Sequence, residues 1–289
     1  MVTDWGLTIR KVIVYGSLMV LFALAMVILY YFVPYPWLIA LFAGGFLFIQ
    51  YFFSDTLVLW STGARVVSPQ EAPGLHRAID NLCIKMNLPK PRVAIVQTDM
   101  PNAFATGRSK KKAVVAVTTG ILSVLNEKEL EGVLAHELSH VQNRDMFIVT
   151  FASFVVSVLS YIVYMVFSMI LSRDNESNFG AHMAAWFVSM ILSNTIGLII
   201  INTVSRYREY GADRGAAYAT GNPDGLISAL KKISGARYSG DDVRVLDSAK
   251  ALCISSTSKN SLLELFSTHP PLEKRIANLE KVRKEMRGY

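Results

Sequence analysis

Two histidines four residues apart, His136 and His140, are the side chains of this sequence best spaced to bind a metal ion. On a helix, positions i and i+4 lie on one face one turn apart, so both imidazoles can reach the same ion. Glu137 follows the first histidine and can contact a water molecule on that ion. The pattern H-E-x-x-H is typical of metalloproteases, where it supplies two zinc ligands and a general base. It also occurs by chance on amphipathic helices, so other parts of the chain must support it.

The residues around this pattern predict the helix that it needs. Asn126 followed by Glu129 has the signature of a capping box, in which each residue satisfies a backbone N–H of the other. Apolar residues then repeat at helical spacing, which gives the helix one buried face. They are Leu130, Val133, Leu134, Leu138 and Val141.

A catalytic zinc needs a third protein ligand and one open position for water. The best third ligand is Glu209, and Asp213 lies four residues later on the same predicted helical face. Glu209 can bind the metal, while Asp213 accepts a hydrogen bond from the second ring nitrogen of a ligand histidine. Such a bond fixes the histidine tautomer and raises its basicity. Alone, these residues also fit a charged surface helix with Arg206 and Arg208. Their combination with H-E-x-x-H favours the metal site.

The chain has 289 residues, of which 52% are hydrophobic and 18% are charged, and its mean hydropathy is +0.35. This length fits one or two ordinary domains. The apolar residues collect in long runs, and the segments between them resemble a soluble enzyme in composition. The formal charge of +7 fits an anionic lipid surface better than a nucleic acid, for which we find no motif. Cys83 and Cys253 match no metal spacing and are predicted to be buried, reduced thiols.

Four uncharged runs are predicted to form membrane helices. The first is longer than the apolar region of a typical signal peptide and no cleavage motif follows it. The second follows after a Pro-Tyr-Pro turn, so the first two predict a membrane hairpin. The third and fourth could also be extensions of the helices that carry the catalytic residues. The runs are Val12–Val33, Trp37–Phe53, Phe147–Leu171 and Ala181–Val204.

The two soluble segments are predicted to share one side of the membrane, because an even number of runs separates them. Segment 54–145 carries 11 Lys and Arg residues and segment 205–289 carries 15. Basic residues prefer the cytoplasmic side. We therefore expect a multi-pass protein of the cytoplasmic membrane, with both termini and the metal site in the cytoplasm. The chain is therefore predicted to have four parts: 1–53 with the hairpin, 54–145 with the H-E-x-x-H helix, 146–204 with two further membrane helices, and 205–289 with the third ligand.

Segment 54–145 is predicted to hold one helix and a small sheet before the metal helix. Ser68 and Pro69 have the cap and first-turn chemistry of a helix start. Three strands follow, and Gly107–Lys112 between the last two is a polar hairpin turn. The lysines of this turn fit a solvated tip better than a contact with lipid head groups. The strands are about Arg92–Thr98, Asn102–Thr106 and Ala113–Thr118.

Helical patterns return in the last segment, over Ser205–Ala219, Pro223–Ile233, Val245–Cys253 and Pro271–Met286. The predicted fold is therefore mainly α and integral to the membrane. It has four transmembrane helices and a cytosolic zincin-like α+β catalytic domain, made of a small sheet and the H-E-x-x-H helix.

Over nearly its whole length the chain resembles the HtpX-type membrane zinc metalloproteases, which are gluzincins related to the CAAX prenyl proteases. Four local matches carry this resemblance. Two are the H-E-x-x-H sequence and the segment Glu209–Asp213. The others are Asn102-Ala103-Phe104-Ala105, similar to the edge strand that pairs with the substrate backbone in this group, and Ser267–Pro271 followed by Arg275, similar to a late His-Pro motif.

The resemblance implies one zinc ion per chain and a peptidase mechanism. Zinc would be held by His136, His140 and Glu209, with Glu137 as general base. His269 and Arg275 would help to stabilise the oxyanion of the transition state. The expected substrates are misfolded or damaged membrane proteins and other unfolded chains, cut at the cytoplasmic face of the lipid bilayer in protein quality control. The edge strand would read backbone more than side chains, which predicts broad sequence tolerance.

Two alternatives are open at this point. A CAAX-type protease acting on prenylated tails is disfavoured because those relatives are larger and have more membrane spans. A multi-pass scaffold or transporter with a degenerate metal site is disfavoured because the four runs carry no charge at their centres. A protein without catalytic function would also have no need for Glu137.

Overall fold

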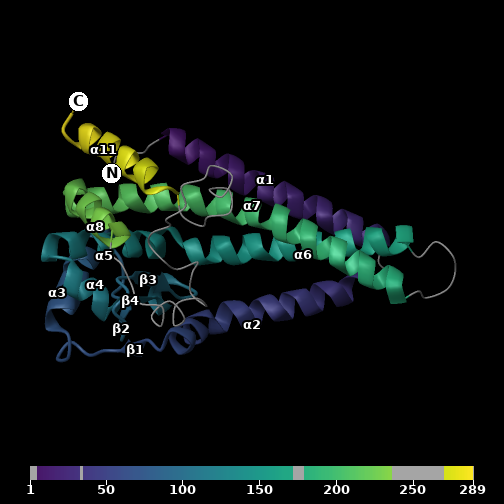
Figure 1. Ribbon diagram of the computed structural model, residues 1–289, viewed down its shortest axis with the longest axis horizontal. Helices are drawn as coiled ribbons and strands as arrows, with labels where there is room; N and C mark the ends of the chain where they lie inside the picture. The colour runs from purple at the N-terminus through teal and green to yellow at the C-terminus, as the bar shows by residue number, and fades with distance from the viewer. Residues whose placement is uncertain (1–4, 33–34, 172–178, 236–269, 289) are drawn as a thin grey trace. The chain divides into compact units, whose positions relative to one another are not determined.

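The structure of this chain is a computed structural model that describes residues 5–32, 35–171, 179–235 and 270–288. It divides into two compact units. The sheet unit comprises Gln50–Phe147 and Arg208–Tyr289, and the helical unit comprises Val2–Ile49 and Ile148–Tyr207. Helices predominate, and one small sheet lies within the sheet unit (Figure 1). Cys253, His269 and the helix predicted over Val245–Cys253 lie outside the described residues.

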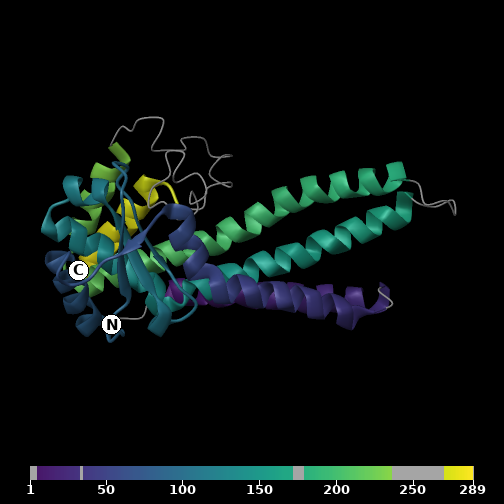
Figure 2. The same cartoon turned by 90° about the horizontal axis from the view of Figure 1, so that it is seen from below.

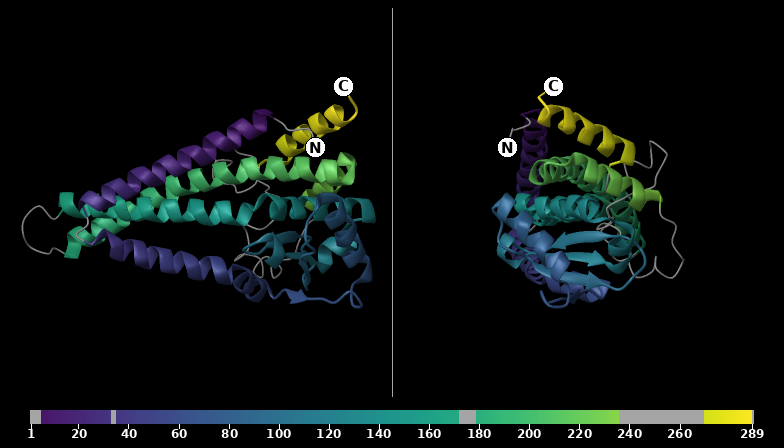
Figure 3. Two further views of the ribbon diagram at one scale, coloured as in Figure 1. Left: turned by 180° about the vertical axis from the view of Figure 1, so that it is seen from behind. Right: turned by 90° about the vertical axis from the view of Figure 1, so that its left-hand side faces the viewer.

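The sheet has four strands in the order β1-β2-β4-β3, so β3 lies at one edge. Strands β2 and β4 run parallel, and the two outer strands pair antiparallel to their neighbours (Figure 3). The three predicted strands are confirmed with shorter ends, whereas the short β1 was not predicted. The strands are β1 (Arg65–Val66), β2 (Arg92–Val96), β3 (Ala103–Thr106) and β4 (Val114–Thr118).

Both faces of the sheet are covered. One face packs on helices α3 (Pro73–Met86) and α5 (Glu127–Asn143), and the other packs on Val58 and Leu59 near the end of α2 (Pro36–Thr62). Because alternate residues of a strand point to opposite faces, nearly continuous apolar strands are the expected result. All residues of β3 and β4 are buried.

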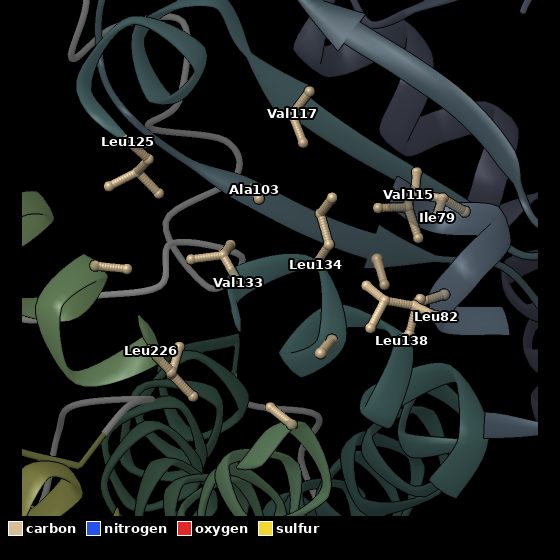
Figure 4. Packing of buried hydrophobic residues seen from close by; sticks show 14 of the residues in the cluster. Ile79, Leu82, Ala103, Val115, Val117, Leu125, Val133, Leu134, Leu138 and Leu226 are labelled. Atoms are coloured by element: carbon tan, nitrogen blue, oxygen red, sulfur yellow. The ribbon is translucent and has the colours of Figure 1, made fainter. Parts of the chain in front are cut away.

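Helix α5 carries the H-E-x-x-H sequence and is fixed by its apolar face. Its predicted capping box is confirmed: the Glu129 N–H donates to Asn126 Oδ1 at 3.0 Å and the Asn126 N–H donates to Glu129 Oε2 at 2.9 Å. Leu134 and Leu138 are fully buried against the sheet and α3 (Figure 4). The helix therefore cannot rotate without exposing this face, which fixes the direction of its histidines.

Three further helices complete the sheet unit: α4 (Thr119–Val124), α8 (Pro223–Gly235) and α11 (Leu272–Met286), with a short 3-10 turn η1 (Lys110–Lys112) between β3 and β4. Helix α8 packs closely on α5. A Cβ on Gly132 of α5 would lie 2.8 Å from the backbone nitrogen of Leu226. The Glu129 carboxylate also accepts hydrogen bonds from Ser228 Oγ at 2.6 Å and Lys232 Nζ at 2.8 Å. The start of α5 is thereby tied to α8.

Two helix starts differ from the sequence predictions. Helix α3 begins at Pro73 rather than at Pro69. Ser68 and Glu71 do exchange the hydrogen bonds of a capping box, but the turn that they start ends at Ala72, which has the non-helical angles φ −137° and ψ 62° before Pro73. Hydrogen bonds from Arg65 and Ser68 lower the pKa of Glu71 to about 2. Helix α11 begins at Leu272, one residue after the prediction. Helix α8 confirms the prediction over Pro223–Ile233.

The helical unit contains α1 (Trp5–Phe32), about half of α2, and the larger parts of α6 (Asp145–Leu171) and α7 (Phe179–Thr220). Within the described residues, Asp145–Leu171 and His182–Thr220 are long and apolar enough to cross a membrane. Helices α6 and α7 lie side by side (Figure 2), and Ser189 Oγ donates to the Ser160 carbonyl at 2.8 Å. Helix α7 is continuous from the fourth apolar run through Ser205–Ala219, so this run does extend from a helix with candidate site residues.

Candidate metal centre

Three side chains from two helices of the sheet unit converge on one point. His136 and His140 come from α5 and Glu209 comes from α7, and one ligand atom of each lies within 4.8 Å of the others. The two Nε2 atoms are 3.1 Å apart, and the Glu209 oxygens lie 3.5 Å from His136 Nε2 and 3.4 Å from His140 Nε2. Tetrahedral zinc with bonds of ~2.0–2.1 Å places its ligand atoms about 3.3 Å apart. The set therefore has the chemistry and the spacing of a zinc site.

The two helices can approach because small residues face each other. A Cβ on Gly215 of α7 would lie 2.5 Å from the Ser139 hydroxyl of α5, which itself donates to the Ala135 carbonyl at 2.8 Å. Gly215 is less than two turns from Glu209 along α7. Absence of a side chain there allows the Glu209 carboxylate to reach the histidines.

Each histidine also has a carboxylate behind it. Asp213 Oδ1 lies 3.0 Å from His136 Nδ1, and Asp145 Oδ2 lies 2.6 Å from His140 Nδ1. When these Nδ1–H groups donate, each Nε2 lone pair points to the shared centre. This is the carboxylate–histidine arrangement that orients ligands in metal sites.

Asp145 was missed by the sequence reasoning. Helix α5 ends with Arg144 in the left-handed conformation, at φ 57°, and this bend lets Asp145, the first residue of α6, contact His140. Arg208 Nε lies 3.4 Å from the same Asp145 oxygen. A carboxylate directly after a metal helix was the available signal, but the bend that directs it could not be read from residue types.

Arg275 of α11 is buried beside this site. Its Nε and Nη2 donate to the two Asp213 oxygens at 2.9 and 2.6 Å, and its Nη1 lies 3.5 Å from Glu209 Oε2. Burial lowers the pKa of this guanidinium, but the two carboxylates outweigh burial and raise it. In the structure Arg275 therefore holds Asp213 and compensates buried negative charge. Its predicted contact with the oxyanion stays a prediction.

The carboxylates also set the protonation of the histidines. Burial alone would lower the pKa of His140, but the Asp145 and Glu209 carboxylates raise it to about 10. The pKa of His136 is also raised, because Asp213 and Glu209 outweigh its burial. A metal ion must replace these protons, since a ligand imidazole is neutral.

The general-base candidate and the candidate substrate strand lie in the same unit. Glu137 is buried on α5 beside His136, and its charge contributes to the raised pKa of Arg275. Ala103, Phe104 and Ala105 lie in the edge strand β3, which packs on α5. Asn102 precedes this strand, and its N–H donates to Thr118 Oγ1 at 2.9 Å.

Known proteins give a consistent match. The pattern of Peptidase family M48 covers residues 69–283. Protease HtpX homolog 2 of Methanosarcina mazei is 52% identical over 252 residues, covering 86% of this chain and 85% of the relative. Protease HtpX homolog of Moorella thermoacetica is 46% identical over 298 residues, covering 98% and 97%. These matches support a membrane metalloprotease.

A solved structure shares the fold. The crystal structure of S. mikatae Ste24p matches with a TM-score of 0.62 at 18% identity, covering 95% of this chain and 67% of that one. At this identity the match concerns the fold alone. The sequence matches decide the family: the chain belongs to Peptidase family M48.

Proposed function

We propose that this metalloprotease is a zinc-dependent endopeptidase in which His136, His140 and Glu209 hold one zinc ion per chain and Glu137 is the general base. One observation carries this proposal: two imidazole Nε2 atoms and a carboxylate converge at zinc-site spacing beside Glu137. A bound zinc ion would lower the pKa of a coordinated water molecule to about 7.

The remaining roles in the reaction belong to side chains around the site. Glu137 accepts the proton of the attacking water and delivers it to the leaving amine. Asp213 and Asp145 hold the imidazoles in the orientation that presents Nε2. Arg275 fixes Asp213 and neutralises part of the charge of the acidic cluster. His269 and Arg275 remain our candidates for additional contacts with the oxyanion.

Strand β3 is the proposed binding site for the substrate backbone. It pairs only with β4 among the described strands, and the other edge is where an extended peptide can add. Ala103 and Ala105 belong to the core cluster that includes α5, so a peptide added at β3 would run alongside the metal helix. Backbone pairing predicts broad sequence tolerance and requires an unfolded substrate segment.

In the proposed membrane arrangement four helices cross the bilayer: the two candidate spans, α6 and α7, and also α1 and α2. Helices α1 and α2 have 28 and 27 residues and include residues 12–32 of the first uncharged run and the whole of the second. Because most of the basic residues lie in segments 54–145 and 205–289, the site and both termini would face the cytoplasm. We infer that the substrates are misfolded or damaged membrane proteins. The relatives that match most of the chain are named HtpX homologs, which does not favour the CAAX-type alternative.

The test compares casein cleavage by the full chain in detergent, as wild type and as Glu137→Gln, with bound zinc counted in both. Loss of the base should reduce cleavage by roughly 10²–10⁴-fold. Zinc should remain near one per chain, because Glu137 is not a proposed ligand. Glu127→Gln, an exposed position on the same helix, is the matched control. Equal cleavage by wild type and Glu137→Gln would refute the proposal.

A further inference from the structure

The basic loop, Gly107–Lys112, is held against Tyr51 and Phe52 of helix α2. Arg108 Nη1 donates to the Phe52 carbonyl at 2.8 Å, and the guanidinium lies 4.7 Å from the centre of the Phe52 ring. The Tyr51 hydroxyl donates back to the Arg108 carbonyl. The loop therefore has a defined place beside α2, which a freely solvated hairpin tip would not need.

Aromatic side chains gather at this place, where one uncharged run ends and another begins. The Tyr51 ring centre lies 5.8 Å from that of Phe52 and 6.4 Å from that of Phe147. Phe52 is at the end of the second uncharged run, and Phe147 begins the third. Aromatic residues concentrate where a membrane helix meets the interface with water. The basic loop is thus attached at the level where lipid head groups are expected.

Beyond this level, α2 continues with an exposed apolar face. Phe53, Leu57 and Trp60 share one face at helical spacing and are 54%, 51% and 83% exposed. Asp55, which lies in the same two turns of α2, is buried, and its carboxylate accepts a hydrogen bond from Arg92 Nη2 at 2.6 Å. This part of α2 therefore presents apolar side chains without an exposed negative charge, as helices do that lie in the membrane interface.

The charges of the loop complement such a surface. Lys111 and Lys112 are exposed and Lys110 is partly exposed. Within the described part of the chain, no carboxylate forms an ion pair with any of the three. Clusters of basic residues next to a membrane helix attract anionic lipids, and the attraction adds up over the lysines.

We propose that the basic loop and the exposed face of α2 form a binding site for anionic phospholipid head groups, with Lys110, Lys111 and Lys112 on the phosphates. This rests on the proposed membrane arrangement. The loop joins β3 to β4, so lipid bound there would hold the proposed substrate strand close to the bilayer surface. Membrane proteins whose unfolded segments emerge from the bilayer would then reach that strand first.

The test is native mass spectrometry of the full chain in detergent, titrated with phosphatidylglycerol or phosphatidylcholine. The loop variant is Lys110→Gln, Lys111→Gln and Lys112→Gln together. The control removes the same charge at Lys128, Lys231 and Lys281, which are exposed elsewhere in the sheet unit. The loop variant should bind phosphatidylglycerol roughly a hundredfold more weakly, because each of the three lysines contributes about fivefold. Phosphatidylcholine binding should not change, and the control should stay close to wild type.

Equal weakening by both triple variants, or no preference of wild type for phosphatidylglycerol, would overturn the proposal. Zinc content of the loop variant shows whether its sheet unit is folded. The double variant Phe53→Ser with Leu57→Ser should weaken the binding of phosphatidylglycerol and of phosphatidylcholine to the same extent. All titrations are repeated in the Glu137→Gln background, because lipid binding requires no peptidase activity. A lipid site that persists while casein cleavage is absent in wild type would refute the proposed function alone.

Discussion

The sheet unit and the helical unit differ in where most of their large apolar side chains lie. In the sheet unit large apolar side chains, mostly Leu, Ile and Val, fill the core together with alanines, and most of the buried charged residues lie at the metal centre. In the helical unit many inward positions are small or polar, whereas large apolar side chains point outward. The inward residues include Ala25, Ala152, Ala185, Ser189 and Asn202, and the outward ones include Met19, Val20, Trp186, Phe187 and Ile191.

This difference indicates two solvents. Only 28% and 20% of the most apolar windows of α6 and α7 are buried, which is too little for core helices of a soluble protein. Lipid tails solvate the outward Ile and Phe as well as a core would, so helix contacts instead use close packing and hydrogen bonds. A Cβ on Gly197 of α7 would lie 2.4 Å from Val156 Cγ1 of α6. In water, by contrast, the same outward side chains would be costly.

The largest expected effect concerns the buried ion pair of the sheet unit. Arg275→Leu leaves Asp213 and Glu209 buried without their positive partner, which should reduce the free energy of unfolding by about 3–5 kcal/mol. Arg283→Leu on the same helix breaks an exposed pair with Asp224 and should cost about 0–1 kcal/mol. Urea unfolding of the two metal-free variants in detergent measures both. Similar losses of unfolding free energy in the two variants would show that burial of the ion pair does not determine its contribution to stability.

The next prediction distinguishes a lipid-facing position from a water-facing one. Ile191 in the helical unit and Ile84 in the sheet unit are both outward-facing, at 49% and 80% exposure. Lysine at the centre of a membrane helix costs about 2.5–3.5 kcal/mol, whereas on a wet surface it is nearly neutral. Ile191→Lys should therefore reduce the fraction of chain that inserts into membranes, and Ile84→Lys should leave it unchanged. Normal insertion of Ile191→Lys would contradict the assignment of α7 to lipid.

A smaller effect is expected where α8 meets the metal helix. Gly132→Ala would place a methyl group 2.8 Å from the Leu226 backbone nitrogen, and such overpacking costs about 1–3 kcal/mol. The same exchange at Gly74 meets nothing within 4 Å and should change stability by about 0.5 kcal/mol or less. Unfolding midpoints and zinc affinity of both variants test this. A Gly132→Ala protein as stable as Gly74→Ala would mean that α8 can shift without disturbing α5.

Much of this arrangement could be predicted from local patterns. The H-E-x-x-H spacing, the Asn126–Glu129 capping box and the alternation of the strands each express a rule that acts over a few residues. Glu209 and Asp213 could likewise be predicted to lie beside the histidines, because residues at positions i and i+4 share one face of a helix. Cys83 is a free, buried thiol as predicted, and burial raises its pKa to about 11.

What could not be predicted depends on contacts between distant residues. Asp145 reaches His140 only because Arg144 adopts a positive φ, and Arg275 meets Asp213 across 62 positions of sequence. The predicted start of α3 was wrong because Pro73 has no N–H to continue the turn that begins at Ser68, so the helix starts again at Pro73. The position of the basic loop depends on Arg108 and Phe52, 56 residues apart.

The central claim is that Glu209 of α7 completes a zinc site with the two histidines of α5. The most direct test counts zinc and casein cleavage in wild type, Glu209→Ala and Glu131→Ala. Glu131 is a partly exposed carboxylate of α5 that pairs with Lys85 at 3.1 Å. Wild type and Glu131→Ala should bind about one zinc per chain and cleave alike. Glu209→Ala should lose both zinc and cleavage, and a Glu209→Ala protein that retains one zinc and full activity would contradict the account.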